Sequence, residues 1–174
     1  SDRFVPLEGI ELSSRLRLQV KKNPKAHRYS YILLHEKGPN VDENVRRRSV
    51  RYPYYIWNKV FVITARLTRY LASRLNYASI LGGGYTISLN YEREDMEGRV
   101  CLKREKESAV VKYICFDKDE WSKLSEYMQA IMKQMEVDCP KTNVKGPPVG
   151  TPGSLVAHYM EEDYYEEYYV YWDA

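Results

Sequence analysis

Residues 112–135 read KYICFDKDEWSKLSEYMQAIMKQM, and this stretch decides the fold because it predicts a strand running directly into a capped amphipathic helix. The alternation through Tyr113 and Cys115 predicts a strand with one face better buried than the other. Asp117 is placed to cap the helix, and Glu120, three residues later, would complete a capping box. Residues at spacings of three and four then form one apolar stripe along the helix. This stripe comprises Trp121, Leu124, Met128, Ile131 and Met135.

The same pattern occurs 61 residues earlier in the chain. In that register Val50–Tyr52 coincides with Val111–Tyr113, and a possible cap, Asn58, coincides with Asp119. The apolar patterns of any two amphipathic helices can be aligned at some offset. Here one offset aligns both a strand and a helix, which favours a duplication. We therefore expect two repeats, at residues 1–77 and 78–139. The stripe positions that coincide with Trp121, Leu124, Met128 and Ile131 are Val60, Ile63, Leu67 and Tyr70.

Each repeat is expected to contain three strands followed by one helix. In the first repeat the strands are expected at residues 12–21, 27–35 and 46–55, and the helix at about 58–75. In the second repeat the strands are expected at residues 85–91, 99–106 and 110–116. Pro53 must lie at an edge or a bend. Gly82-Gly83-Gly84 lacks the Lys-Ser/Thr of a phosphate-binding loop, so we interpret it as a hinge between the repeats. The expected fold class is α+β, with antiparallel sheets and the two helices packed on them or on each other.

The charge is distributed unevenly along the 174 residues. The chain has 27 Lys and Arg against 24 Asp and Glu, but residues 155–174 hold six of the acids and no Lys or Arg. Residues 1–77 hold 16 basic and 6 acidic side chains, whereas residues 78–140 hold 9 and 12. Residues 140–154 are rich in Pro and Gly and predict a linker. A basic body followed by an acidic tail is the main indication of function.

Several features of the sequence bear on the compartment. The sequence contains no run of eighteen apolar residues, so we expect no transmembrane helix and no membrane partner. Its N-terminus has no apolar segment of signal-peptide length, and because it lacks Met we expect that an upstream segment has been removed. Three cysteines, Cys101, Cys115 and Cys139, have no metal-ligand spacing, and any disulfide would leave one over. We therefore expect a reducing intracellular location, which is compatible with the nucleus.

Tyrosines lie among the arginines and lysines of the predicted strands, which favours binding of single-stranded nucleic acid. Basic side chains neutralise phosphates, and exposed bases stack on aromatic rings at about 1–3 kcal/mol per base. Such faces can also be ordinary solvated surface with the tyrosines in the core, but the basic excess of the whole first repeat favours the binding interpretation. The candidates are Arg15, Arg17, Lys21, Arg28, Tyr29, Tyr31, Arg46, Arg47, Arg48, Arg51 and Tyr52, with Arg99, Lys103, Arg104 and Lys112 in the second repeat.

The tail at residues 155–174 combines acids with six tyrosines and one tryptophan. Negative charge and stackable rings are also the two features that single-stranded DNA offers. We therefore expect the tail to occupy the chain's own binding face or to dock on a partner. A merely solubilising disordered tail would explain the acids but not the seven rings. The residues expected to act in this way are Tyr164, Tyr165, Glu166, Glu167, Tyr168, Tyr169, Tyr171 and Trp172.

Nothing in the sequence favours catalysis. His27, His35 and His158 show neither metal-site nor catalytic spacing, and no nucleophile motif is present. The pair Asp117 and Glu120 is better explained as helix caps than as an acid and a base. We expect no enzymatic activity, no metal and no cofactor.

The segment FDKDEWSKLSEYM, with the preceding strand GRVCLKREKE, resembles the end of the single-stranded-DNA-binding core of the transcriptional positive cofactor 4 family. The similarity covers residues 84–136, about a third of the chain, as a short pattern. Members of that family dimerise through the helix and bind single strands on curved sheets. Duplicated strands-then-helix units occur in purine-rich-element-binding repeat proteins and, in a longer form, in Whirly proteins.

The resemblance implies an intramolecular pseudo-dimer of the two repeats. It implies that Lys103, Arg104 and Lys112 lie in the strands used for DNA, and that Trp121 belongs to the helix-to-sheet core. The first repeat departs from the pattern, with Ile56-Trp57-Asn58 in place of the DEW junction and Pro53 in its third strand. The second repeat is net acidic, which argues against symmetric binding.

We therefore expect sequence-tolerant binding of single-stranded nucleic acid, with DNA preferred over RNA on the resemblance alone, in replication or transcription. The tail would autoregulate binding or recruit replication or transcription proteins, and the chain is a possible homo-oligomer. The alternative is a structural or assembly protein, perhaps viral, whose tyrosine-rich tail docks on a neighbouring subunit.

Overall fold

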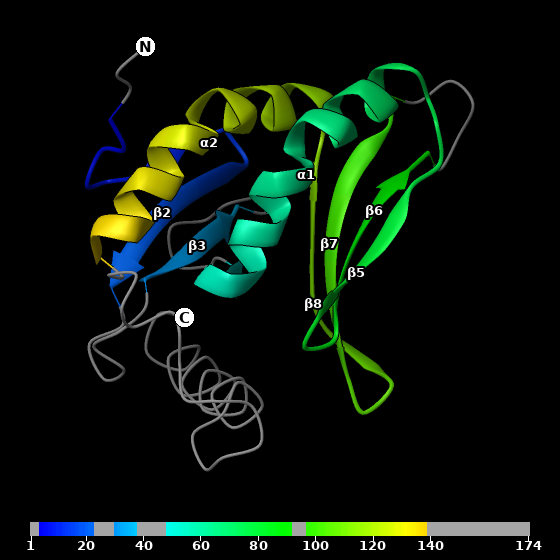
Figure 1. Cartoon of the computed structure of the whole chain (residues 1–174), viewed down its shortest axis with the longest axis horizontal. Coiled ribbons are helices and arrows are strands. Elements are labelled where there is room, and N and C mark those ends of the chain that lie inside the picture. Colours follow the sequence, from blue (N-terminus) through cyan, green and yellow to red (C-terminus); the bar gives the residue numbers. More distant parts are fainter. Residues whose placement is uncertain (1–3, 23–29, 38–47, 92–96, 139–174) are drawn as a thin grey trace.

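A computed structural model describes residues 4–22, 30–37, 48–91 and 97–138 of the chain (Figure 1). The first half contains β1 (Ile10–Glu11), β2 (Leu16–Lys22), β3 (Ser30–Glu36), β4 (Arg48–Pro53) and α1 (Tyr54–Ala72). The second half contains β5 (Ala78–Gly82), β6 (Tyr85–Asn90), β7 (Arg99–Lys106), β8 (Ala109–Phe116) and α2 (Lys118–Asp138). The linker at residues 140–154 and the acidic tail lie outside the described residues.

Each half is an antiparallel sheet followed by a helix, which confirms the predicted α+β class and the two repeats. The strand orders are β1-β2-β3-β4 and β5-β6-β7-β8, so neighbours in sequence are neighbours in each sheet. Pro53 ends the edge strand β4, as expected for a residue without a backbone donor. The prediction of three strands per repeat is wrong, because each described sheet has four. The additional strands, β1 and β5, are short and carry little alternation of apolar residues.

The interpretation of Gly82-Gly83-Gly84 as a hinge between the repeats is also wrong. These residues make the turn between β5 and β6, inside the second sheet, and all three have positive φ. A Cβ on Gly84 would lie 2.3 Å from the Glu105 carbonyl oxygen of the neighbouring strand β7, so a side chain cannot fit there. The glycines are therefore required by a tight turn and a close backbone approach.

The two helices begin in different ways. In α2 the predicted capping box is confirmed, because the Glu120 amide donates to Asp117 Oδ1 at 2.7 Å and the Asp117 amide donates to Glu120 Oε1 at 2.9 Å. The prediction of Asn58 as the cap of α1 is wrong, because α1 begins four residues earlier with Pro53 as its N-cap. Pro53 has a φ of −69°, which its ring fixes, and it makes no side-chain capping bond.

The repeats align with an offset of 64 residues, and the predicted offset of 61 is wrong. The buried residues of α1 match those of α2 when Trp57 is paired with Trp121 and Leu71 is paired with Met135. The same offset pairs the two N-caps, Pro53 and Asp117. The register of 61 instead gave stripe positions to Ile63 and Tyr70, which are only partly buried.

The helices form one layer that packs against both sheets (Figure 1). The α1 helix contacts β3 and β4 of its own repeat and β5, β6 and β7 of the other, while α2 contacts β7 and β8 and also β2 and β3. Trp121 of α2 donates its indole N–H to Thr68 Oγ1 of α1 at 3.0 Å. Ser30 Oγ of β3 donates to the Met135 carbonyl of α2 at 3.2 Å.

One hydrophobic core therefore serves both repeats. All five residues of the predicted α2 stripe are buried, and Trp121 is 1% exposed. The rings of Tyr52 in β4 and Tyr85 in β6 lie 5.7 Å apart and join the two sheets directly. Neither α1 nor α2 is long and apolar enough to cross a membrane.

Candidate nucleic-acid interface

The outer face of the first sheet carries four of the predicted binding residues. Alternation along each strand sends Leu18, Leu34 and Val50 into the core and sends their neighbours to the opposite face. The register then aligns Lys21 with Tyr31, and Gln19 with Leu33 and Arg51. We define the outer face of the first sheet by Arg17, Gln19, Lys21, Tyr31, His35, Ser49 and Arg51.

An arginine–tyrosine stack lies on this face. The Arg51 guanidinium carbon lies 4.6 Å from the centre of the Tyr31 ring, within the range of a cation–π interaction. Arg51 itself is 2% exposed, so its side chain is almost fully buried against the ring. Lys21 is the cross-strand partner of Tyr31, on the same face. A ring, a cation beneath it and a second cation beside it are therefore held together by three neighbouring strands.

A chain of hydrogen bonds crosses the same face beside the stack. His35 Nε2 lies 2.8 Å from Gln19 Oε1, and His35 Nδ1 lies 2.9 Å from Ser49 Oγ. With the Nε2 proton donated to Gln19, Nδ1 accepts from the Ser49 hydroxyl. Sequence reasoning missed these three residues, although the alternation that places Arg17 and Tyr31 outward also places them outward.

Arg17 extends the face toward the edge strand β1, where its guanidinium pairs with the Glu11 carboxylate. The hydrogen bond from Arg17, together with its charge, lowers the pKa of Glu11 below its ordinary value. The Arg17 side chain is 31% exposed. It therefore lies on the surface but already has an acidic partner.

Arg15 holds the two repeats together. Its guanidinium donates to Glu36 Oε1 at 2.9 Å, to the Cys115 carbonyl at 2.9 Å and to Glu120 Oε1. Ser13 Oγ, two residues earlier, donates to the other oxygen of Glu120. Partial burial opposes the charge of Arg15, but the hydrogen bonds and charges of Glu120 and Glu36 outweigh it and raise the pKa of Arg15. Arg15 therefore has a structural role in addition to any contact with a ligand.

Three predicted residues lie on inner faces instead. Tyr52 is 0% exposed and packs between Trp57 and Tyr85 in the core, so in this structure it offers no ring to a base. Arg104 is 2% exposed and lies over the Tyr85 ring at 5.0 Å. Lys112 is on the same face of the second sheet as Arg104 and donates to the Arg51 carbonyl at 3.2 Å, which joins the edges β8 and β4. Alternation along the strands explains why all three side chains point inward, because a residue next to each of them in sequence points outward.

The second sheet brings fewer basic residues to its outer face. Lys103 lies there beside its cross-strand partner Tyr113, and it forms an ion pair with Glu105 at 2.9 Å. Cys101 and Cys115, two residue pairs further along the same strands and on the same face, form a disulfide with Cα atoms 4.1 Å apart. The sequence predicts reduced thiols, but two cysteines fourteen residues apart can face each other across a hairpin, and here they do.

A cleft of about 390 Å³ lies where the two repeats meet. One wall comes from Arg15 and Glu36 at the ends of β2 and β3, and the other comes from the second repeat. This second wall consists of Arg99, Tyr113, Ile114, Cys115 and the α2 cap Asp117.

The remaining predicted residues lie outside the described part of the chain. These are Arg28, Tyr29, Arg46 and Arg47, together with the whole acidic tail. Arg48 begins β4, but the position of its side chain is not described. Within the described ranges no three His, Cys, Asp or Glu residues are grouped so as to hold a metal ion.

Comparison of the chain with protein-family models, with curated proteins and with solved structures finds no match. The functional interpretation therefore rests on the geometry of the chain's own residues.

Proposed function

We propose that this protein binds single-stranded nucleic acid, with little dependence on sequence, through the outer face of the first sheet. The observation that carries the proposal is the stack of Arg51 under Tyr31 with Lys21 beside it. Proteins that bind single strands in this way combine a basic surface for the backbone with rings on which bases stack. The outer face of the first sheet has both.

The roles of the individual residues follow from their burial. Tyr31 presents a ring to a base, and Arg51 holds that ring in place from beneath. Lys21 and Arg17 neutralise backbone phosphates, Arg17 by exchanging Glu11 for a phosphate oxygen. Gln19 and Ser49 add hydrogen-bonding groups that can contact bases or the backbone.

We further propose that the two repeats form an intramolecular pseudo-dimer in which the helices pair. Support comes from the offset of 64 residues, which matches both tryptophans and both N-caps, and from the contact of α1 with α2. Tyr52–Tyr85 and Lys112–Arg51 add contacts between the repeats at the adjoining sheets.

The remaining parts of the proposal rest on the sequence. DNA is preferred over RNA, and the protein acts in replication or transcription. The acidic aromatic tail regulates binding or recruits other proteins, as its charge is opposite to that of the first repeat.

A titration of labelled oligonucleotides tests the function directly. Full-length protein should bind single-stranded DNA more tightly than a duplex of the same sequence, and affinity should fall steeply as salt is added. Two DNA strands of unrelated sequence should bind with similar affinity. If the protein binds no oligonucleotide but associates with itself independently of salt, that result would instead favour the alternative, a structural or assembly protein.

A further inference from the structure

The solvent-facing side of α1 carries positive charge that no acid on the helix balances. We define the outer stripe of α1 as Lys59, Val62, Arg66 and Arg69. Spacings of three, four and three residues place these side chains on one face of the helix, and all four are exposed. The 19 residues of α1 include no Asp or Glu. The stripe therefore holds three cations around one apolar side chain.

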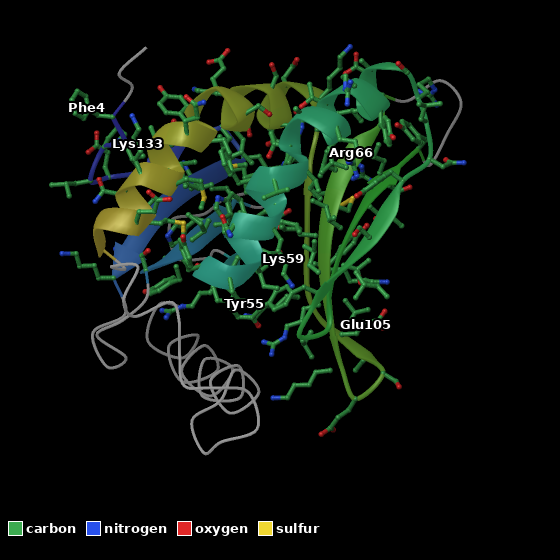
Figure 2. The ribbon with its side chains drawn as sticks, in the orientation of Figure 1. Phe4, Tyr55, Lys59, Arg66, Glu105 and Lys133 are labelled. Carbon is green, nitrogen blue, oxygen red and sulfur yellow. A yellow bond between two sulfur atoms is a disulfide. The ribbon has the colours of Figure 1, made fainter. Side chains whose placement is uncertain are left out.

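The two arginines of the stripe have no partner among the described residues. Neither Arg66 nor Arg69 forms a hydrogen bond or an ion pair within the described ranges. Lys59 donates from Nζ to the Leu81 carbonyl at 2.6 Å, so its charge meets a carbonyl oxygen rather than a carboxylate. Figure 2 shows Lys59 and Arg66 along the same helix. Like charges three residues apart on a helix repel each other, so a negatively charged ligand would relieve the repulsion between Arg66 and Arg69.

The second helix provides a matched comparison. At the offset of 64 residues, Glu126 takes the place of Val62 and Ala130 takes the place of Arg66. The equivalent positions on α2 are Lys123, Glu126, Ala130 and Lys133. Two lysines and one glutamate leave that stripe with one net positive charge, against three on α1. The strongly basic stripe is therefore specific to α1 and is not a general property of the helix layer.

Val62 indicates what kind of anion fits the stripe. Its side chain is 73% exposed and lies between Lys59 and Arg66 along the helix. A fitting ligand therefore carries apolar or aromatic groups between its negative charges. Residues 161–169 of this chain read EEDYYEEYY, in which acids and tyrosines alternate in short blocks. Carboxylates pair with Lys and Arg, and tyrosine rings can stack on guanidinium groups and pack on Val62.

The chain is long enough to bring this segment to α1 within one molecule. The indole of Trp121 contacts Thr68, next to Arg69, and α2 ends at Asp138, about 26 Å further along its axis at 1.5 Å per residue. Residues 139–154, when extended at roughly 3.3 Å per residue, reach up to about 50 Å. The acidic segment can therefore return from the end of α2 to the outer stripe of α1.

We propose that the outer stripe of α1 docks the acidic aromatic tail of the same chain, residues 155–174. The stripe faces away from the sheets on which α1 packs, so the docked tail leaves the outer face of the first sheet open. Its six acids then weaken nucleic-acid binding through their charge and not by covering the binding face. This regulatory consequence rests on the proposed function, whereas the docking itself does not.

Cross-linking of full-length protein locates the tail. Arg66→Lys keeps the positive charge of the stripe and supplies an amine that a carbodiimide can couple to a nearby carboxylate. Mass spectrometry should find the amine at position 66 linked to tail carboxylates at least about five-fold more often than Lys133 of α2, because docking raises the local concentration of the tail. Lys21 reports a tail that lies on the outer face of the first sheet instead. A mixture of ¹⁵N-labelled and unlabelled chains distinguishes links within one chain from links between two chains.

Quenching by acrylamide tests which charges hold the tail. Trp57 and Trp121 are buried, so the quenchable emission of full-length protein comes from Trp172, the third tryptophan of the chain. The double variant Arg66→Gln/Arg69→Gln should raise the quenching constant roughly two-fold, since a released tail exposes its ring to solvent. The matched α2 variant Lys123→Gln/Lys133→Gln should leave that constant unchanged.

Three results would overturn the docking while the proposed function stands. These are tail cross-links mainly to Lys21 or Lys133, cross-links only between chains of different isotopic label, and a quenching constant that is the same in both double variants. Neither measurement requires DNA. Docking that is confirmed in a protein that binds no oligonucleotide would therefore overturn the proposed function and leave the docking in place.

Discussion

The two repeats use equivalent positions for different purposes. At the offset of 64 residues the core positions keep their apolar character, with Trp57 and Trp121 both almost fully buried. The outer position taken by Arg51 in β4 is taken by Cys115 in β8. One repeat therefore presents an arginine–tyrosine stack where the other has a disulfide.

The N-cap residues of the two helices also differ between the repeats. Pro53 starts α1 through its fixed backbone angle alone, whereas Asp117 starts α2 with a complete capping box that also anchors Arg15 of the first repeat. The core positions shared by the repeats therefore maintain the scaffold, whereas the side chains of the outer faces and of the helix caps differ between the repeats.

The largest expected effect tests whether the two halves of the core are equivalent. Trp57→Ala and Trp121→Ala should each cost about 3–5 kcal/mol of unfolding free energy, because each removes a buried aromatic ring. Urea denaturation measures both losses. Val62→Ala on α1, where the side chain is 73% exposed, is the control and should change stability little. If one tryptophan variant unfolds like the wild type, its helix does not contribute to the shared core.

A smaller effect separates the two outer faces. Tyr31→Ala should weaken binding of single-stranded DNA by about 1–3 kcal/mol through lost stacking, and Lys21→Ala should flatten the slope of log affinity against log salt by roughly 0.7. Lys103→Ala on the second sheet should do less, since Lys103 already has Glu105 as its partner. Anisotropy titrations at several salt concentrations measure all three. A larger loss for Lys103→Ala than for Lys21→Ala would transfer the interface to the second sheet.

Removal of the acidic tail tests whether the tail competes with DNA for the basic first repeat. A flexible linker of about fourteen residues would span roughly 20 Å and would hold the tail at millimolar effective concentration around the body of the protein. Truncation after Gly153 should therefore raise the affinity for single-stranded DNA modestly, most visibly at low salt. A synthetic peptide of residues 155–174 should compete with DNA for the truncated protein. Unchanged affinity and no competition would assign the tail to partner docking.

The smallest expected effect concerns the edge pairs of the two sheets. Glu11 in β1 pairs with Arg17, whereas the corresponding pair in the second sheet is Ile80 with Thr86. The pKa of Glu11 is lowered, so its contribution to stability is present above pH 4.5, the ordinary value, and is lost as the pH falls through the folded-state pKa. Glu11→Gln should therefore slightly reduce the acid-dependent loss of stability below pH 4.5, as measured by urea midpoints. Ile80→Thr should leave that pH dependence unchanged.

Local patterns predicted the parts of the fold that depend on neighbouring residues. The capping box and the α2 stripe could be read from Asp117, Glu120 and Trp121 because their spacing follows directly from helix geometry. The start of α1 could not, because Pro53 provides no side-chain cap and the aromatic residues around it suit a strand equally well.

The candidate site was less predictable because it depends on register. A shift by one residue decides whether Tyr31 or Tyr52 reaches the surface, and composition does not contain that information. Arg17 and Lys21 were placed on the solvent face of their strand by alternation, whereas Arg104 was misjudged by one position. The cleft between the repeats combines Arg15 with Arg99, and no local pattern relates two residues so far apart in the chain.

The packing of α2 across the first sheet also constrains how the chain folds during synthesis. Ser13 and Glu120, which form a hydrogen bond, are separated by 107 residues, and Ser30 and Met135 by 105. At a translation rate of about 5–20 residues per second, the ribosome reaches the second member of each pair roughly 5–20 s after the first. Until then the apolar side of β2 lacks its covering helix and that of β3 is covered by α1 alone, so the nascent first half exposes apolar sheet of the kind that chaperones shield.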